Sequence, residues 1–350
     1  MKKLKVGYAP LSKNLKAAGD RRRLVFWAKA RGHEIVTDLD RKVDVLVVSE
    51  KSNFNSFSLA KNRAPIVFDL VDAYLSPSSI SEDFARGIAK WFTGEIGGAI
   101  KPYSYHVKDF CSIADAVVCS SIEQKEVISK FNSRTQVILD SHEEIEFLEI
   151  AKLISMRPNT NRILWEGQPA TIPGIRQISS ALLELQNMTD FELDLVTDER
   201  YFKILGNFVQ GDTISLIKKD LTKNLENLKI VPWSIDNLVK VAKTSKLGLI
   251  PIDISVPMQR LKPENRMLIM WRLGLPCLTS PSPAYIRVAS EAEVSSVCYD
   301  SNSWLSKIIN LLDNEDFAHE EILKGQNYLR ENHTEKILLE KWDNVIESVL

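Results

Sequence analysis

Short apolar runs alternate with longer amphipathic runs along almost the whole chain, and this alternation limits the possible folds more than any other feature. Residues 43–49 (VDVLVVS) and 65–70 (PIVFDL) are apolar nearly throughout, as expected of parallel strands buried on both faces. The stretch from about Asp20 to Arg31 instead places Leu24 and Trp27 on one stripe, which predicts a helix. Strands that alternate with helices are typical of an α/β protein with parallel sheets.

The alternation occurs in two successive series, separated by a polar, turn-rich stretch between Asp140 and Thr160. The first series begins with a strand at Lys5–Tyr8 and the second with a strand at Arg162–Trp165. We therefore predict two Rossmann-like, doubly wound parallel-sheet domains, over residues 1–152 and 153–334. Ligands of such sheets bind beyond the carboxyl ends of the strands, so a site is expected there.

Composition excludes several classes of protein. The 350 residues carry a net charge of −1, so there is no overall basic field for a nucleic-acid partner. The four cysteines form no C-x-x-C pair, which excludes a disulfide scaffold and fits a reducing cytosol. No run approaches the roughly 20 apolar residues of a spanning helix. We expect a cytoplasmic protein, and peripheral contact with the inner face of the cell membrane through local basic residues stays open.

Several sharp motifs are absent from the sequence. It contains no P-loop, no G-x-G-x-x-G and no G-x-S-x-G elbow. Asp38 and Asp40 have the D-x-D spacing with which some glycosyltransferases hold a metal, but they fall in a short predicted surface loop. We expect neither a metal nor a bound cofactor.

Residues 260–285 (RLKPENRMLIMWRLGLPCLTSPSPAY) carry the strongest signal. A polar loop leads into a helix, and Pro263 suits the first turn, where no N–H is needed. Free backbone N–H groups, the helix dipole, Lys262 and Arg266 would converge on one spot, which predicts a phosphate or diphosphate site. On composition alone, a buried α/β crossover with two surface cations explains the segment equally well.

This segment resembles the donor-binding segment of GT-B-fold glycosyltransferases of the family 4 kind. In that family a K-x-x-N-[KR] loop opens a helix that ends in G-x-P; the matching residues are Lys262, Asn265, Arg266, Gly274 and Pro276. Residues 114–121 (ADAVVCSS), 165–167 (WEG) and 230–234 (IVPWS) resemble further segments of the family. The resemblance therefore spans nearly the whole chain.

The resemblance implies two domains that face a cleft, the N-terminal one on the acceptor side and the C-terminal one binding the nucleotide sugar. It also implies a last helix over 335–350 that crosses back to the N-terminal domain. It implies transfer of a sugar from a UDP-, GDP- or CMP-activated donor to a glycan or lipid-linked acceptor, without metal and with retention, in polysaccharide biosynthesis. The expected donor-binding residues are Arg260, Lys262, Glu264, Asn265, Arg266, Gly167 and Trp233.

One departure from the family pattern is important. Ile269 stands where family members carry the glutamate that holds the donor ribose, and Leu261 stands at the offset of an earlier glutamate. Two alternatives stay open for this reason: an unusual donor such as a CMP-activated acidic sugar, and a non-catalytic binding protein of the same fold. A nucleotide-sugar epimerase or hydrolase on the same fold also stays open.

Further candidates come from the strand ends of the first series. Asp69 and Asp72 follow the 65–70 strand, and with His106 they are the predicted catalytic residues, although a lone histidine is more often structural. Arg21, Arg22 and Arg23 lie at a predicted helix start, where they oppose the helix dipole. This indicates a ligand, although a solvated helix start is the plainer interpretation. The predicted cleft and acceptor residues are Gly19, Asp20, Arg21, Arg22, Asp140 and His142.

Overall fold

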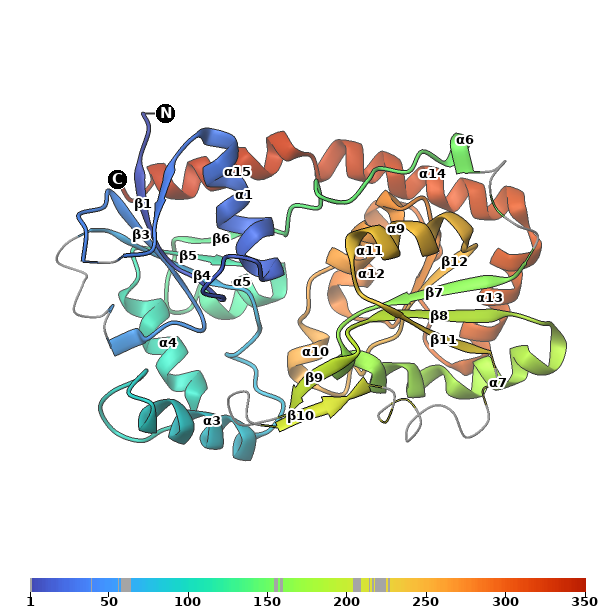
Figure 1. Ribbon diagram of the computed structural model, residues 1–350, viewed down its shortest axis with the longest axis horizontal. Coiled ribbons are helices and arrows are strands. Elements are labelled where there is room, and N and C mark those ends of the chain that lie inside the picture. Colours follow the sequence, from blue (N-terminus) through green and yellow to red (C-terminus); the bar gives the residue numbers. More distant parts are fainter. Residues whose placement is uncertain are drawn as a thin grey trace. The chain divides into compact units, whose positions relative to one another are not determined.

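The computed structural model describes residues 2–38, 40–55, 57, 64–153, 157, 160–203, 209–213, 215, 217, 225 and 227–350. The chain divides into two compact units (Figure 1). Unit 1 comprises residues 1–142, 256–263 and 333–350, and unit 2 comprises residues 143–255 and 264–332. The first segment of unit 1 ends at His142, whereas the sequence analysis placed the domain boundary at residue 152. The roles of the two domains stay predictions.

Unit 1 is built on a six-stranded parallel sheet with the order β2-β1-β3-β4-β5-β6. Its strands are β1 (Lys5–Ala9), β2 (Glu34–Val36), β3 (Val45–Ser49), β4 (Ile66–Leu70), β5 (Ala116–Cys119) and β6 (Thr135–Val137). Its helices are η1 (Asp20–Leu24), α1 (Val25–Arg31), α3 (Ile80–Phe92), α4 (Tyr103–Ile113), α5 (Ile122–Ile128), α10 (Pro257–Arg260) and α15 (Glu335–Glu347).

Unit 2 contains a five-stranded parallel sheet with the order β11-β8-β7-β12-β13. Its strands are β7 (Arg162–Glu166), β8 (Glu192–Thr197), β11 (Leu228–Pro232), β12 (Leu247–Ile250) and β13 (Cys277–Thr279). An antiparallel pair that the sequence did not predict, β9 (Arg200–Lys203) and β10 (Val209–Asp212), follows β8. The helices are α6 (Ile150–Leu153), η2 (Pro169–Ile178), α7 (Ser179–Met188), α9 (Ile235–Thr244), α11 (Asn265–Arg272), α12 (Pro283–Glu291), α13 (Ser301–Asp313) and α14 (Glu315–Asn332).

Strand β3 illustrates why the apolar runs form central strands. Its side chains point alternately to the two faces of the sheet, and all of them are buried. Val45 and Val47 belong to one core cluster, whereas Leu46 and Val48 belong to the cluster on the opposite face. A strand covered on both faces has no polar side, so its sequence is a continuous apolar run.

The predicted crossing of the last helix is confirmed. The chain leaves unit 2 after Asn332, and α15 packs against α1 in unit 1. Trp342 stacks on Trp27 with a centroid distance of 6.2 Å, and the indole N–H of Trp27 donates to Asp343 at 2.7 Å. The apolar face of the helix is covered in this way.

Helix α3 is capped by Ser79, which accepts from the Glu82 N–H. One helix start differs from the prediction. Helix α11 begins at Asn265 with Glu264 as its cap residue, so Pro263 precedes the helix instead of lying in its first turn. Among the described residues, no helix is both long and apolar enough to cross a membrane.

Candidate functional site

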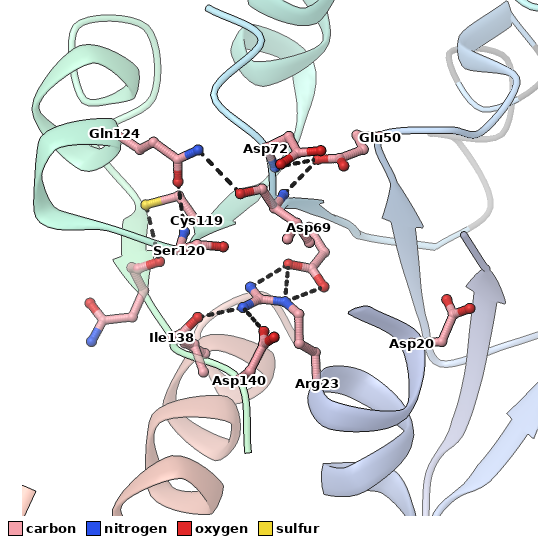
Figure 2. Close-up of polar contacts among 12 residues, drawn as sticks. Asp20, Arg23, Glu50, Asp69, Asp72, Cys119, Ser120, Gln124, Ile138 and Asp140 are labelled. Carbon is pink, nitrogen blue, oxygen red and sulfur yellow. Dashed lines mark hydrogen bonds and ion pairs between the residues drawn. The ribbon is translucent and has the colours of Figure 1, made fainter. Parts of the chain in front are cut away.

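The carboxyl edge of the unit 1 sheet carries a cluster of polar side chains, shown in Figure 2. Glu50 follows β3, Asp69 lies within β4 near its end, and Ser120 follows β5. Ladder pairing aligns Ser49 with Asp69 and Leu70 with Cys119, so these strand ends are neighbours. Parallel pairing therefore brings together residues that are far apart in the sequence.

Arg23 lies at the centre of this cluster and is fully buried. Its Nη2 atom lies 2.6 Å from Asp69 Oδ1, and its Nη1 donates to the Ile138 carbonyl at 2.6 Å (Figure 2). Nη1 also reaches Asp140 Oδ1 at 3.4 Å. Burial lowers the pKa of Arg23, but the two carboxylates outweigh burial and the net change is upward. Arg23 therefore has protein partners, in place of the solvent or the ligand that its position at a helix start indicated.

Asp69 and Asp140 are therefore both engaged by one guanidinium. Asp69 is 1% exposed and accepts from two nitrogens of Arg23. Burial raises the pKa of Asp140, and the charge of Arg23 opposes that shift. Their predicted roles in catalysis and acceptor binding stay predictions, and their contacts favour a part in holding the site together.

Asp20 and Gly19 organise the first loop of unit 1. The buried Asp20 carboxylate accepts from the Tyr8 hydroxyl at 2.7 Å, the Leu11 N–H at 2.7 Å and the Ser12 hydroxyl at 2.6 Å. A Cβ on Gly19 would lie 2.4 Å from Leu11 Cδ1, so the end of the Leu11 side chain would have to move to accommodate one. The contacts of both residues serve the loop itself.

The two arginines that follow Asp20 have different surroundings. Arg21 is half-buried, and its Nη1 donates to the Lys16 carbonyl at 3.2 Å. Arg22 is buried, and its carbonyl accepts from the Ser141 N–H at 2.7 Å. This bond joins the start of the first helix to the chain segment that leaves the sheet before unit 2. Contact of either side chain with an acceptor stays a prediction.

Glu50 is a buried carboxyl that sequence reasoning missed. Its Oε2 accepts from the backbone N–H groups of Val71 at 2.7 Å and Asp72 at 2.8 Å, and its carbonyl accepts from the Tyr103 hydroxyl at 2.6 Å. Burial, followed by the charge of Asp72, raises the pKa of Glu50 to about 8. A carboxyl directly after an apolar strand was the available signal, and strongly shifted groups of this kind cluster at functional sites.

The predicted histidines lie outside this cluster. His106 lines a hollow of about 410 Å³ together with Asn55, Gly97 and Phe110, and neither Asp69 nor Asp72 lines it. Burial and then Lys101 lower the pKa of His106, whose Nε2 has no hydrogen-bond partner among the described residues. The structure therefore does not place His106 with the two predicted catalytic aspartates.

His142 packs against a second histidine. The two buried rings of His142 and His333 are 5.1 Å apart, at the points where the chain leaves and re-enters unit 1. This contact connects two segments of unit 1. An acceptor-binding role for His142 stays a prediction.

The carboxyl edge of unit 2 brings three predicted donor-binding residues to one strand end. Trp233 follows β11, and its indole N–H donates to Glu166 Oε1 at 3.0 Å. Arg266, in the first turn of α11, donates from Nη1 to the Glu166 carbonyl at 3.3 Å. Gly167 directly follows Glu166. Glu166, which the sequence analysis did not select, is therefore the residue that Trp233 and Arg266 both contact.

The remaining donor-side candidates are divided between the units. Glu264 is buried and pairs with Arg287 of α12 at 3.3 Å, so its carboxylate is held by a cation inside unit 2. Asn265 Oδ1 has no hydrogen-bond partner among the described residues. Arg260 and Lys262 belong to unit 1 and Arg266 to unit 2, so their convergence on one phosphate stays a prediction.

The D-x-D loop shows only a local turn. The Asp40 N–H donates to Asp38 Oδ1 at 3.3 Å, and the residue between them lies outside the described residues. Within the described part of the chain, no group of three or more His, Cys, Asp or Glu side chains could hold a metal ion.

Comparison with known proteins identifies the fold. No family model matches the chain, and no curated protein is significantly similar in sequence. Among solved structures, HepE from Anabaena in complex with UDP-glucose superposes with a TM-score of 0.68 at 12% identity, over 99% of both chains. A glycosyltransferase from Rickettsia africae gives a TM-score of 0.61 at 14% identity, over 100% of this chain and 99% of that one.

Two further matches are consistent with this result. WaaG, a glycosyltransferase involved in lipopolysaccharide biosynthesis, gives a TM-score of 0.59 at 12% identity, over 98% of this chain and 99% of that one. TarM gives a TM-score of 0.57 at 12% identity over 86% of this chain, and the match spans 54% of TarM. The chain has the GT-B fold, as the sequence predicted, and resembles nucleotide-sugar glycosyltransferases in fold.

Proposed function

We propose that this chain is a glycosyltransferase that moves a sugar from a nucleotide-activated donor to a hydroxyl group of a glycan or lipid-linked acceptor. The observation that carries the proposal is the strand end at Glu166, where Arg266 and Trp233 meet in unit 2. The GT-B fold supports it, since HepE has been solved with UDP-glucose. The setting that we propose is the synthesis of a surface glycan in the cytoplasm or at the inner face of the cell membrane.

The chemistry of this strand end suits a nucleotide diphosphate. The guanidinium of Arg266 can make paired, charge-assisted hydrogen bonds to phosphate oxygens. The first N–H groups of α11, an eight-residue helix, add positive potential at the same place. These groups would stabilise the negative charge that builds up on the leaving phosphate as the sugar departs. Arg260 and Lys262 are proposed as further cations for this charge.

Arg266→Ala should weaken binding of the donor nucleotide by at least tenfold, or about 1.4 kcal/mol, because a charge-assisted contact to phosphate is lost. Calorimetric titration with UDP, GDP and CMP at one fixed salt concentration measures the effect. Arg330→Ala is the matched control, since it removes the same charge from an exposed position on α14 of unit 2. Parent-like affinity of Arg266→Ala for all three nucleotides would place the donor site elsewhere.

The same titrations separate the donor classes. Parent affinity for UDP or GDP more than tenfold above that for CMP would exclude a CMP-activated acidic sugar and leave the transferase proposal intact. Tighter binding of CMP would instead favour an acidic sugar, because that donor carries a single phosphate and a carboxylate.

A non-catalytic binding protein is the second candidate, and Ile269 is the observation that favours it. Ile269 is 3% exposed and offers no acceptor to a ribose hydroxyl, whose lost partner would cost roughly 1–3 kcal/mol. Release of free nucleotide from UDP-sugars or GDP-sugars, measured with and without added glycan, separates the candidates. Binding without release favours the binding protein, and release that needs no acceptor favours a hydrolase.

A further inference from the structure

We propose that Glu50 is a positioning residue on the acceptor side, whose buried carboxyl fixes the Val71–Asp72 backbone and so sets where Asp72 meets an acceptor hydroxyl. The proposal rests on the proposed function. Asp72 is the half-buried member of the two aspartates at the end of β4, whereas Asp69 is held by Arg23. It is therefore the carboxylate that a hydroxyl group of a sugar can reach.

Val71, the residue before Asp72, is held at both its N–H and its carbonyl. Glu50 accepts the Val71 N–H at 2.7 Å, and the Gln124 side-chain amide donates to the Val71 carbonyl at 3.2 Å (Figure 2). Gln124 is itself held, because its Oε1 accepts from the Ser120 N–H at 2.9 Å. Residues after β3, after β5 and on α5 thus converge on one turn.

The Asp72 backbone has partners of its own. Its N–H donates to Glu50 at 2.8 Å, and its carbonyl accepts from the Tyr74 N–H at 2.8 Å. Glu50 in turn is anchored at its backbone carbonyl by the Tyr103 hydroxyl of α4. Rigid placement of this kind is what a group that orients a reacting hydroxyl needs, because small displacements cost rate.

The carboxyl of Glu50 is well suited to act through Asp72 instead of contacting substrate. It is 2% exposed, so a sugar does not reach it. Burial raises its pKa, and the Asp72 charge adds to the shift. Loss of Glu50 should therefore affect the acceptor and leave the donor site in unit 2 unaffected.

The first test needs no substrate. In the ligand-free protein, Glu50→Ala should speed amide hydrogen exchange at Val71 and Asp72 by at least tenfold, because both N–H groups lose their acceptor. Glu50→Gln keeps an acceptor oxygen and should retain protection within about threefold of the parent. Unchanged exchange in Glu50→Ala overturns the proposal. If Glu50→Ala does not fold, Glu50→Asp replaces it, since its shorter side chain cannot span to both groups.

The second test uses steady-state kinetics with the donor identified by titration. Glu50→Ala should raise the acceptor KM or lower kcat by at least tenfold, while the donor KM stays within about twofold of the parent, and Glu50→Gln should restore the parent values. Glu321→Ala is the matched control, because buried Glu321 likewise accepts a backbone N–H, that of Ser295 at 2.6 Å, in unit 2. Equal effects in both variants would reduce Glu50 to a structural role and overturn the proposal.

The two tests separate this proposal from the proposed function. If the parent transfers no sugar, the proposed function fails and the acceptor role of Asp72 fails with it. Amide hydrogen exchange still reports whether Glu50 holds the Val71 and Asp72 N–H groups. If the parent transfers sugar and Glu50→Ala matches it in both acceptor KM and kcat, only the present proposal fails.

Discussion

Asp69→Ala should lower the free energy of unfolding by roughly 3–5 kcal/mol, because it leaves the fully buried Arg23 without its main counter-charge. The remaining partners, the Ile138 carbonyl at 2.6 Å and Asp140 at 3.4 Å, do not replace a contact that involves two nitrogens of the guanidinium. Urea denaturation measures the loss, and hydrogen exchange along β1 to β6 assigns it to unit 1.

An exposed ion pair provides the control for this result. Arg41 and Glu34 lie 3.3 Å apart with side chains 54% and 38% exposed, so Arg41→Ala should cost no more than about 1 kcal/mol. Equal losses of unfolding free energy in Asp69→Ala and Arg41→Ala would contradict the conclusion that Arg23 and Asp69 form a buried, stabilising ion pair.

Glu50→Gln should become steadily more stable relative to the parent as the pH rises from about 5 to about 8. Burial and the Asp72 charge raise the folded-state pKa of Glu50 to about 8, against about 4.3 in an unfolded chain. Between these values the folded parent binds a proton that the unfolded chain has lost. The stability that this carboxyl contributes is therefore complete below about pH 4 and is lost as the pH rises through about 8.

The glutamine cannot ionise, so the difference in unfolding free energy should grow by up to about 1.4 kcal/mol per pH unit in this window. Denaturation of parent and variant at several pH values measures it. The groups that act on Glu50 are Asp69 and Asp72 from β4 and its following loop, Tyr74, and Tyr103 from α4. Glu126→Gln, on the exposed face of α5, corrects for the change in net charge. If the difference in unfolding free energy between Glu50→Gln and the parent does not vary with pH, the raised pKa of Glu50 is contradicted.

Part of the site could be predicted because its signals are local or came from the family resemblance. Trp233, Gly167 and Arg266 were selected from short segments, and the structure brings them to one strand end. Glu166 was missed, because nothing in the segment WEG distinguishes a residue that accepts from Trp233 and Arg266 from a solvated one. His106 was selected for its chemistry alone, and the direction in which it faces along α4 placed it in a separate hollow.

Most elements of the two parallel sheets followed from the sequence by itself, whereas the antiparallel pair β9 and β10 did not. The apolar run of β3 marks a strand covered on both faces, and the apolar face of α15 had to be covered by another element. Both signals are local, because burial acts on each residue of an element through the periodicity of that element.

Only the tertiary structure decided which polar groups meet. Arg23 and Asp69 pair across 46 positions in the chain, and Glu50 reaches Val71 because β3 and β4 are neighbours in the sheet. The sequence contained all these residues, but their charge states and partners depend on desolvation and on distances of a few ångströms. Such quantities arise only when the strand order brings distant segments together. For this reason the sequence did not reveal that Arg23 is buried among protein partners at the centre of unit 1.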